Sequence, residues 1–206
     1  MTIGRFISFA TLAVAMSSAS LRGQGTFIYD QQSADETTPG GTTAAIQANQ
    51  PIGQSFTPSL PSVGFVRLFL DDTTSGNSLG ATVYVNLRIT SITGPIFGSS
   101  APVFMPDGFG GYTNFIFSPS LSVAPGTTYF FQPVVQSGDN WAIVGYNYNY
   151  SGGTAFTLGS AVPGSDLWFR EGIVVVPEPS SVALGAVGLA TLLLFRRKGI
   201  IEFLRN

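Results

Sequence analysis

The ten residues Ala81-Thr82-Val83-Tyr84-Val85-Asn86-Leu87-Arg88-Ile89-Thr90 decide the fold class. Apolar side chains at every odd position, from Ala81 to Ile89, alternate with Thr, Tyr, Asn and Arg side chains at the even positions. Successive side chains of a β-strand point to opposite faces, so this alternation puts one face of the strand in a core. The stretch therefore predicts a half-buried β-strand.

The segments on either side also predict strands. Residues 64–70 form an apolar run in which Arg67 is the sole charge, a pattern typical of a central strand. We expect further strands at 26–30, 52–57, 96–97, 112–117, 127–135, 141–150, 154–158 and 167–176. The stretches 31–50 and 98–111 are expected to be loops, because they are polar or rich in Gly and Pro. About nine or ten short strands separated by turns predict an all-β, antiparallel sandwich of jelly-roll type.

The composition excludes several kinds of chemistry. The chain has no His and no Cys, which rules out Ser-His-Asp and Cys-His nucleophile systems and ordinary zinc sites. Residues 26–176 hold three cations and nine anions, a net charge of −6, so there is no footprint for nucleic-acid binding. No pair of carboxylates stands out as the acid and base of a hydrolase. We therefore expect a protein that is not an enzyme and that needs no cofactor.

The N-terminus has the three parts of a secretory signal peptide. Arg5 gives a positive start, Phe6 to Met16 is apolar, and Ser17 to Gly25 is small and polar. We expect residues 1–25 to be removed, with cleavage after Ala19 or near residues 23–25. An uncleaved anchor is the alternative, but the apolar run is short for a membrane-spanning helix.

The C-terminus has a second segment of this kind. Pro177-Glu178-Pro179 precedes an uncharged run from Val182 to Phe195, and Arg196-Arg197-Lys198 follows at once. Fourteen helical residues span roughly 21 Å, less than the ~30 Å hydrocarbon core of a bilayer. Basic flanks stay on the cytoplasmic side of a membrane. This order of parts is typical of a transient stop-transfer segment, and a permanent single anchor is the alternative.

The three parts of the tail resemble the bacterial PEP-CTERM sorting signal. The resemblance covers about residues 176–198, and the eight residues 199–206 extend beyond the usual end of that signal as a short cytoplasmic tail. It implies that a membrane-embedded exosortase recognises the chain and cleaves near Pro177-Glu178-Pro179, in a bacterium that makes exopolysaccharide or biofilm. The expected organisation is a signal peptide at 1–25, a β-sandwich at 26–175 and the sorting signal with its transmembrane helix at 176–198.

Five aromatic residues are candidates for binding a glycan: Trp141, Tyr146, Tyr148, Tyr150 and Trp168. In a regular strand the three tyrosines would share one face, beside the amide groups of Asn147 and Asn149. Stacked rings beside amides suit a sugar, whereas the alternative is a core face or a ladder of rings that stabilises the sheet. The segments 54–57, 63–70 and 117–129 also look similar to jelly-roll domains of exported bacterial proteins, some of which bind carbohydrate.

Acidic residues offer a second candidate site. Asp71 and Asp72 lie in the turn predicted at 71–80 and, with Asp139 and Asp166, could supply oxygen ligands to calcium. No spacing among them matches a calcium loop, so solvated turn residues are the alternative interpretation.

The sequence as a whole predicts an exported protein that starts as a membrane-anchored precursor and ends at the cell surface or outside the cell. We expect a structural or adhesive role there, and a carbohydrate-binding module for exopolysaccharide is the alternative.

Overall fold

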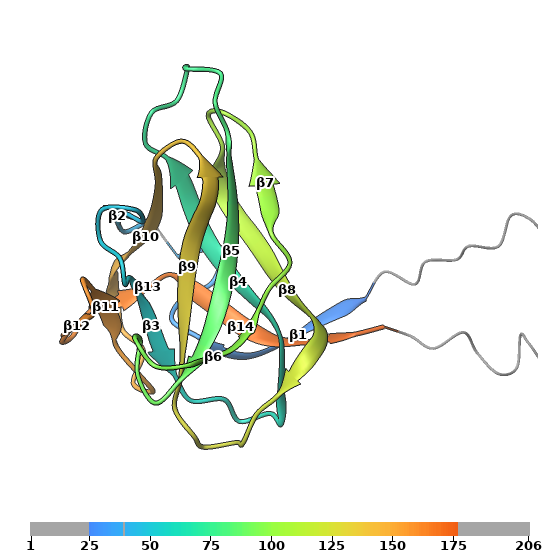
Figure 1. Ribbon diagram of the computed structural model, residues 1–206. Helices are drawn as coiled ribbons and strands as arrows, with labels where there is room; N and C mark the ends of the chain where they lie inside the picture. The colour runs from blue at the N-terminus through green and yellow to red at the C-terminus, as the bar shows by residue number, and fades with distance from the viewer. Residues whose placement is uncertain (1–24, 39, 177–206) are drawn as a thin grey trace, which may run out of the picture. The chain divides into compact units, whose positions relative to one another are not determined.

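The computed structural model describes residues 25–38 and 40–176, which form two antiparallel β-sheets with fourteen strands (Figure 1). The compact unit comprises Phe27–Val174. The described residues contain strands, turns and loops but no helix. The signal peptide expected at 1–25, the transmembrane helix of the sorting signal and the tail at 199–206 lie outside the described residues, apart from Gly25 and Val176.

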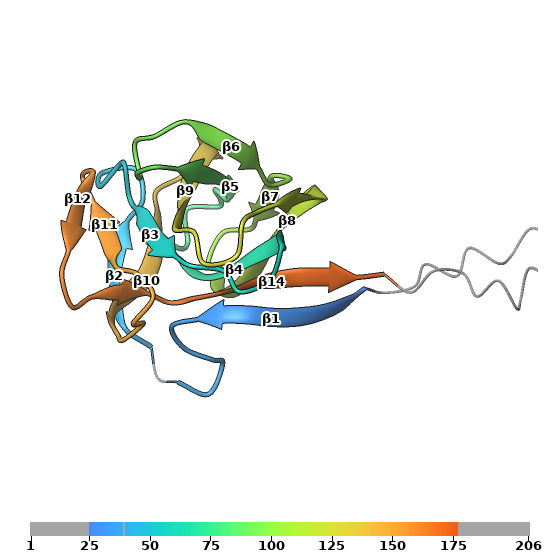
Figure 2. The same ribbon diagram turned by 90° about the horizontal axis from the view of Figure 1, so that it is seen from below.

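The first sheet has seven strands and carries both ends of the unit. Its main order is β1-β14-β4-β10-β13, while β8 pairs with β4 and β2 with β10. The bounds are β1 Thr26–Gln32, β2 Thr42–Ala45, β4 Ser62–Asp72, β8 Gly110–Ser122, β10 Trp141–Tyr148, β13 Asp166–Leu167 and β14 Phe169–Val175. Strands β1 and β14 run side by side in opposite directions and extend beyond the other strands (Figures 1 and 2).

The second sheet is built around the strand that the alternating pattern predicts. Its order is β12-β11-β3-β9-β5-β6, and β7 also pairs with β5. The bounds are β3 Gly53–Phe56, β5 Ala81–Ile89, β6 Ile96–Ser99, β7 Val103–Met105, β9 Tyr129–Gly138, β11 Ala155–Thr157 and β12 Ser160–Val162. Strand β5 pairs with β9 from Ala81 opposite Gly138 to Ile89 opposite Tyr129.

The hydrophobic core lies between the two sheets. On β5 the side chains of Ala81, Val83, Val85 and Leu87 are buried, as the alternation predicts. Three rings from different strands, Phe56, Phe131 and Phe169, meet in this core with centroids 5.2–6.3 Å apart. Burial of such rings is the main favourable contribution to folding of a domain without disulfides.

Three strands are not predicted from the sequence, and several others, β8 above all, are longer than predicted. The single strand expected at 167–176 is two strands, β13 and β14, which are separated at Trp168. Strand β2 is Thr-Thr-Ala-Ala, β7 has three residues within a Gly- and Pro-rich stretch, and β12 is also three residues long. None of them has the length or the apolar alternation that marks a strand in isolation. Strand β8 continues to Ser122 although Pro119 lies within it, so the proline there did not end the strand. The all-β, antiparallel fold class is confirmed, whereas the jelly-roll arrangement stays a prediction.

Candidate functional site

The two tryptophans that were candidates for glycan binding are covered by protein. Trp141 is fully buried, with its ring 6.0 Å from that of Phe109. Trp168 is 1% exposed, and its ring lies 4.4 Å from that of Tyr112. Its indole N–H donates a hydrogen bond to the backbone carbonyl of Asp35, at 3.3 Å. Neither ring presents an open face to solvent.

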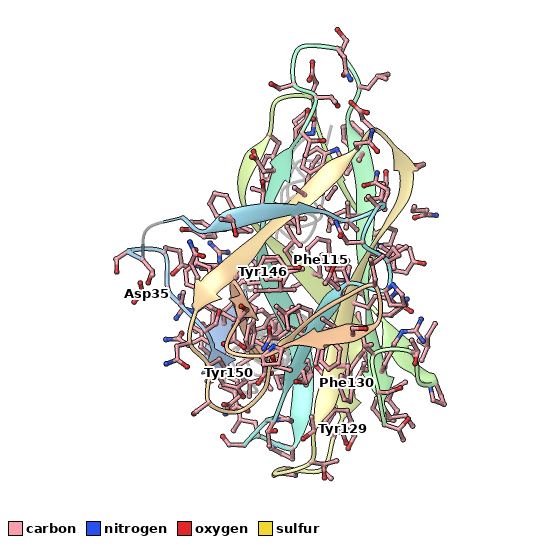
Figure 3. All side chains as sticks on the ribbon, turned by 90° about the vertical axis from the view of Figure 1, so that its left-hand side faces the viewer. Asp35, Phe115, Tyr129, Phe130, Tyr146 and Tyr150 are labelled. Carbon is pink, nitrogen blue, oxygen red and sulfur yellow. The ribbon has the colours of Figure 1, made fainter. Side chains whose placement is uncertain are left out.

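The three tyrosines do not share one face, so that expectation is wrong. Tyr146 has a φ of +69°, and the pairing of β10 with β13 shifts register between Gly145 and Tyr148. A left-handed residue interrupts the regular alternation of side chains along a strand. Tyr146 and Tyr150 consequently pack against the main core (Figure 3). Tyr148 instead joins a smaller cluster with Trp168.

Two carboxylates, Asp72 at the end of β4 and Asp107 in the β7–β8 loop, bind backbone groups around the β4–β5 loop. Asp72 accepts hydrogen bonds from the amides of Thr74 and Gly108, both at 2.8 Å. Asp107 accepts hydrogen bonds from the amides of Gly76 and Ser78, at 2.8 and 2.7 Å, and these bonds lower the pKa of Asp107. Asp72 therefore closes an Asx-type turn at Thr74, and Asp107 holds the same loop from the neighbouring β7–β8 loop.

Asp71, the other half of the predicted calcium pair, is half-buried beside Gly110. Asp139 is hydrogen-bonded to the side chains of Thr74 and Asn77, and these bonds lower its pKa. Among residues 25–38 and 40–176, no group of three or more His, Cys, Asp or Glu side chains is placed to hold a metal ion. Asp166 does not lie with this loop but belongs to a separate network.

That network joins the two sheets through buried polar groups. Asp166, 3% exposed, accepts hydrogen bonds from the side-chain amide of Gln54 at 2.6 Å and from the backbone amide of Tyr150 at 2.7 Å. Gln54 in turn accepts the amide of Leu167 at 3.0 Å. The hydroxyl of Tyr150 donates to the side chain of Gln31, also at 3.0 Å. Each polar group named in this network has a hydrogen-bond partner, as buried polar groups require.

A buried carboxyl group lies between β14 and β1. Glu171 is fully buried, and neither carboxylate oxygen makes a well-formed hydrogen bond with the described residues, although Asp30 and the Gln31 amide lie close to it. Burial, followed by the charge of Asp30, raises the pKa of Glu171 to about 9. Burial would also raise the pKa of Asp30, but hydrogen bonds from Ser59, Leu60 and Gln31 outweigh it and lower that pKa. At neutral pH Glu171 is therefore protonated beside an ionised Asp30.

A second missed feature is an ion-pair cluster that fastens the segment after β1. Glu36 lies between two guanidinium groups, 2.9 Å from Nε of Arg67 and 2.5 Å from Nη1 of Arg170. Arg170 also stacks on Tyr29, with Cζ 3.4 Å from the ring centroid. Figure 3 shows the neighbouring Asp35 at the margin of the unit, where this segment crosses it. The cluster thus holds in place the segment that covers Trp168. Glu36, Arg67 and Arg170 are far apart in the sequence, and no sequence pattern links them.

The sorting motif begins where the last strand ends. Strand β14 stops at Val175, and Pro177-Glu178-Pro179 follows after one intervening residue. Only Val175 and Val176 of the motif belong to the described residues. Among all the residues that the structure describes, no helix is long and apolar enough to cross a membrane.

The fold and the tail together define an all-β domain that carries a C-terminal protein-sorting signal. Residues 175–198 match the family model described as the PEP-CTERM protein-sorting motif. The chain therefore carries a PEP-CTERM sorting motif, and this motif supports its being a substrate of exosortase. The search of curated proteins and the search of solved structures gave no match.

Proposed function

We propose that this chain is an exported protein whose β-domain has a structural or adhesive role at the cell surface or in the extracellular matrix. The PEP-CTERM motif at 175–198 carries the proposal, because it marks the chain for export and for exosortase processing. The N-terminal segment 1–25, read as a signal peptide, supports the same destination.

We also propose that the role is not catalytic. The chain has no His and no Cys. The buried carboxylates of Asp166 and Asp72 accept hydrogen bonds from a side-chain amide and from a backbone amide, so they hold the fold in place. Glu171 and Asp30 are adjacent carboxyls, but Asp30 is occupied by the amides of Ser59 and Leu60 at 2.7 and 2.9 Å. A hydrolase needs its carboxyl groups free to reach substrate and water, so this arrangement favours stability over catalysis.

The alternative, a binding module for exopolysaccharide, has weaker support. A sugar platform needs exposed ring faces, and Trp141, Tyr148 and Trp168 are all buried. The buried rings support the interpretation in which the aromatic residues build the core.

The test compares three forms of the protein in its own host. The native chain, a variant with Pro177, Glu178 and Pro179 replaced by alanine, and a control with Ser180→Ala and Ser181→Ala are expressed with and without exosortase. The native chain and the serine control should reach the cell surface only when exosortase is present. The triple-alanine variant should stay in the membrane fraction. Equal surface levels of all three forms would contradict the proposal.

A binding assay then separates the two roles. The folded body, residues 26–176, is passed over a panel of bacterial polysaccharides. The structural role predicts no saturable binding, and saturable binding that is lost in Tyr146→Ala but kept in Phe104→Ala would favour the carbohydrate module.

A further inference from the structure

Strand β1 lies at the edge of the first sheet and, among the described strands, pairs only with β14 (Figures 1 and 2). The rings of Phe27 and Tyr29 meet the ring of Phe65 on β4, with centroid distances of 4.8 and 5.5 Å. Asp30 accepts a hydrogen bond from the backbone amide of Ser59, at 2.7 Å. An edge strand of this kind can leave by breaking a single ladder, and such local opening costs less free energy than global unfolding.

The carboxyl group of Glu171 points into the interior beneath this edge. Phe169 lies two residues before Glu171 in β14 and therefore on the same face, and its ring packs 5.2 Å from that of Phe131 in the core. The next residue, Gly172, lies against β1, because a Cβ there would be 1.9 Å from the carbonyl oxygen of Ile28. Glu171 is fully buried, and neither of its oxygens makes a well-formed hydrogen bond with the described residues. Strand β1 is therefore part of what keeps water from this carboxyl group.

No cation faces Glu171 from the elements that the structure describes around it. The titratable groups near it are Asp30 of β1, Tyr150 after β10 and, beyond Tyr150, Asp166 of β13. Arg67 and Arg170 lie opposite each other on β4 and β14, and both point to the other face, because neighbouring side chains of a strand alternate. The remaining cation of the domain, Arg88, bonds to the side chain of Gln132 in the second sheet. An ionised Glu171 would thus be a buried charge without a counter-charge, next to a second carboxylate.

Glu171 keeps its proton up to alkaline pH while β1 is in place. Burial, followed by the charge of Asp30, raises the pKa of Glu171 to about 9, whereas an exposed glutamate has an ordinary pKa of 4.5. Residues 26–176 contain no His and no Cys, the side chains that ordinarily titrate between pH 5 and 9. Burial also raises the pKa of Tyr150, so this neighbour stays neutral over the same range. A pH response of the strand pair between pH 5 and 9 therefore comes from Glu171.

We propose that β1 is a pH-released strand, which leaves β14 when Glu171 gives up its proton to water. Asp30 and the rings of Phe27 and Tyr29 leave with the strand, so the edge of β14 opens and the Glu171 carboxylate becomes hydrated. The second sheet does not contain β1 and keeps its pairing. The closed form holds the proton more tightly, so acid favours it, and the equilibrium constant for opening rises up to tenfold per pH unit between about 4.5 and 9. This release does not depend on the sorting function.

Hydrogen exchange of the full chain, held in a mild nonionic detergent, measures this opening at pH 5, 7 and 9. The amides of residues 26–33 are followed by mass spectrometry, among them that of Ser33, which donates to the carbonyl of Phe169 at 3.1 Å. Protection factors, corrected for the pH dependence of intrinsic exchange, should fall by up to about tenfold per pH unit. Protection that stays constant from pH 5 to 9 would overturn the proposal.

Two substitutions identify the responsible group. Glu171→Gln stays neutral and keeps nearly the same shape, so the protection of residues 26–33 should become independent of pH. Glu36→Gln is the matched control, because Glu36 binds the two arginines on the other face of the same sheet. The control should retain the steep pH dependence even where its protection is lower. A Glu171→Gln chain that keeps the slope would contradict the proposal, and so would a control that loses it.

The response of the central strand separates local release from global unfolding. Exchange of β5, residues 81–89, requires the second sheet to open, so its protection should exceed that of residues 26–33 at least about tenfold at every pH. Local opening exposes little surface, so the protection of β1 should depend only weakly on low concentrations of urea. Equal protection and equal urea dependence in β1 and β5 would mean that Glu171 controls global stability alone, and the release of β1 would then be excluded.

Discussion

Glu171 is fully buried next to Asp30, and the two carboxyl groups respond in opposite ways to this position. Burial and the neighbouring charge raise the pKa of Glu171 to about 9, whereas hydrogen bonds from Ser59, Leu60 and Gln31 outweigh burial and lower the pKa of Asp30. One group therefore holds a proton and the other holds a charge over the neutral range. The pair joins β14 to β1, the strands from which the chain leaves the unit.

The stability of the domain should fall as the pH rises above about 4.5. The unfolded chain loses the Glu171 proton near its ordinary pKa of 4.5, whereas the folded chain keeps it up to about 9. The stability from a raised pKa is therefore complete below 4.5 and is lost progressively up to 9, by at most about 1.4 kcal/mol per pH unit. Urea unfolding of residues 26–176 at pH 5, 7 and 9 measures this slope. Glu171→Gln, which stays neutral, should flatten it, and an unchanged slope in that variant would contradict the assignment.

Removing Asp166 should destabilise the domain by about 2–4 kcal/mol. Asp166→Ala leaves the amide groups of Gln54 and Tyr150 without their buried acceptor, and unsatisfied buried donors are costly. Asp107→Ala is the matched control, because Asp107 also accepts two hydrogen bonds but does so at the loop surface. Chemical denaturation of both variants should show a clearly larger loss for Asp166. Equal losses would mean that the Gln54–Asp166 network contributes no more than a surface turn.

The core between the sheets predicts a large contrast between two phenylalanines. Phe131→Ala should lower the free energy of unfolding by about 3–5 kcal/mol, because it removes a fully buried ring that meets Phe56 and Phe169. Phe104→Ala should change it by no more than about 0.5 kcal/mol, since Phe104 is 66% exposed. Thermal and urea unfolding of the two variants check both values. A Phe104 variant as unstable as the Phe131 variant would argue against this sandwich core.

Glu36→Gln should loosen the segment over Trp168 with little change in global stability. The ion pairs of Glu36 with Arg67 and Arg170 are partly exposed, and such pairs contribute about 1 kcal/mol or less. Hydrogen exchange should speed up at Ser33–Thr38, and the fluorescence of Trp168 should shift to the red as water reaches it. Asp107→Asn is the control, because it removes a carboxylate charge from a loop outside this segment. Unchanged exchange in the Glu36 variant would show that the ion pairs do not hold the segment.

The parts of the fold with a strong local signal were predictable. The alternation from Ala81 to Ile89 and the apolar run at 64–70 correspond to β5 and β4, because each carries its burial pattern in consecutive residues. Strand β2 could not be found in the same way. Its Thr-Thr-Ala-Ala sequence becomes a strand only because β10 supplies the hydrogen-bonding partner.

The candidate site was less predictable, because it depends on contacts between distant residues. The face assigned to Tyr146, Tyr148 and Tyr150 assumed a regular strand, and the left-handed φ of Tyr146 has no marker in an Asn- and Tyr-rich sequence. Glu171 follows Arg170 in an apolar strand and looks like an ordinary solvent-facing residue, yet its neighbours Asp30 and Val66 come from other strands and bury it. The sorting motif is the opposite case, since its three parts lie within one continuous stretch.

Intact mass spectrometry of the surface form of the protein tests the central claim most directly. The account predicts a chain that has lost its N-terminal 19–25 residues and that ends near Pro177-Glu178-Pro179, without the apolar run and the Arg196-Arg197-Lys198 cluster. In cells without exosortase, the same measurement should find the C-terminal segment still attached. A surface form that keeps residues 182–198 while exosortase is present would contradict the account.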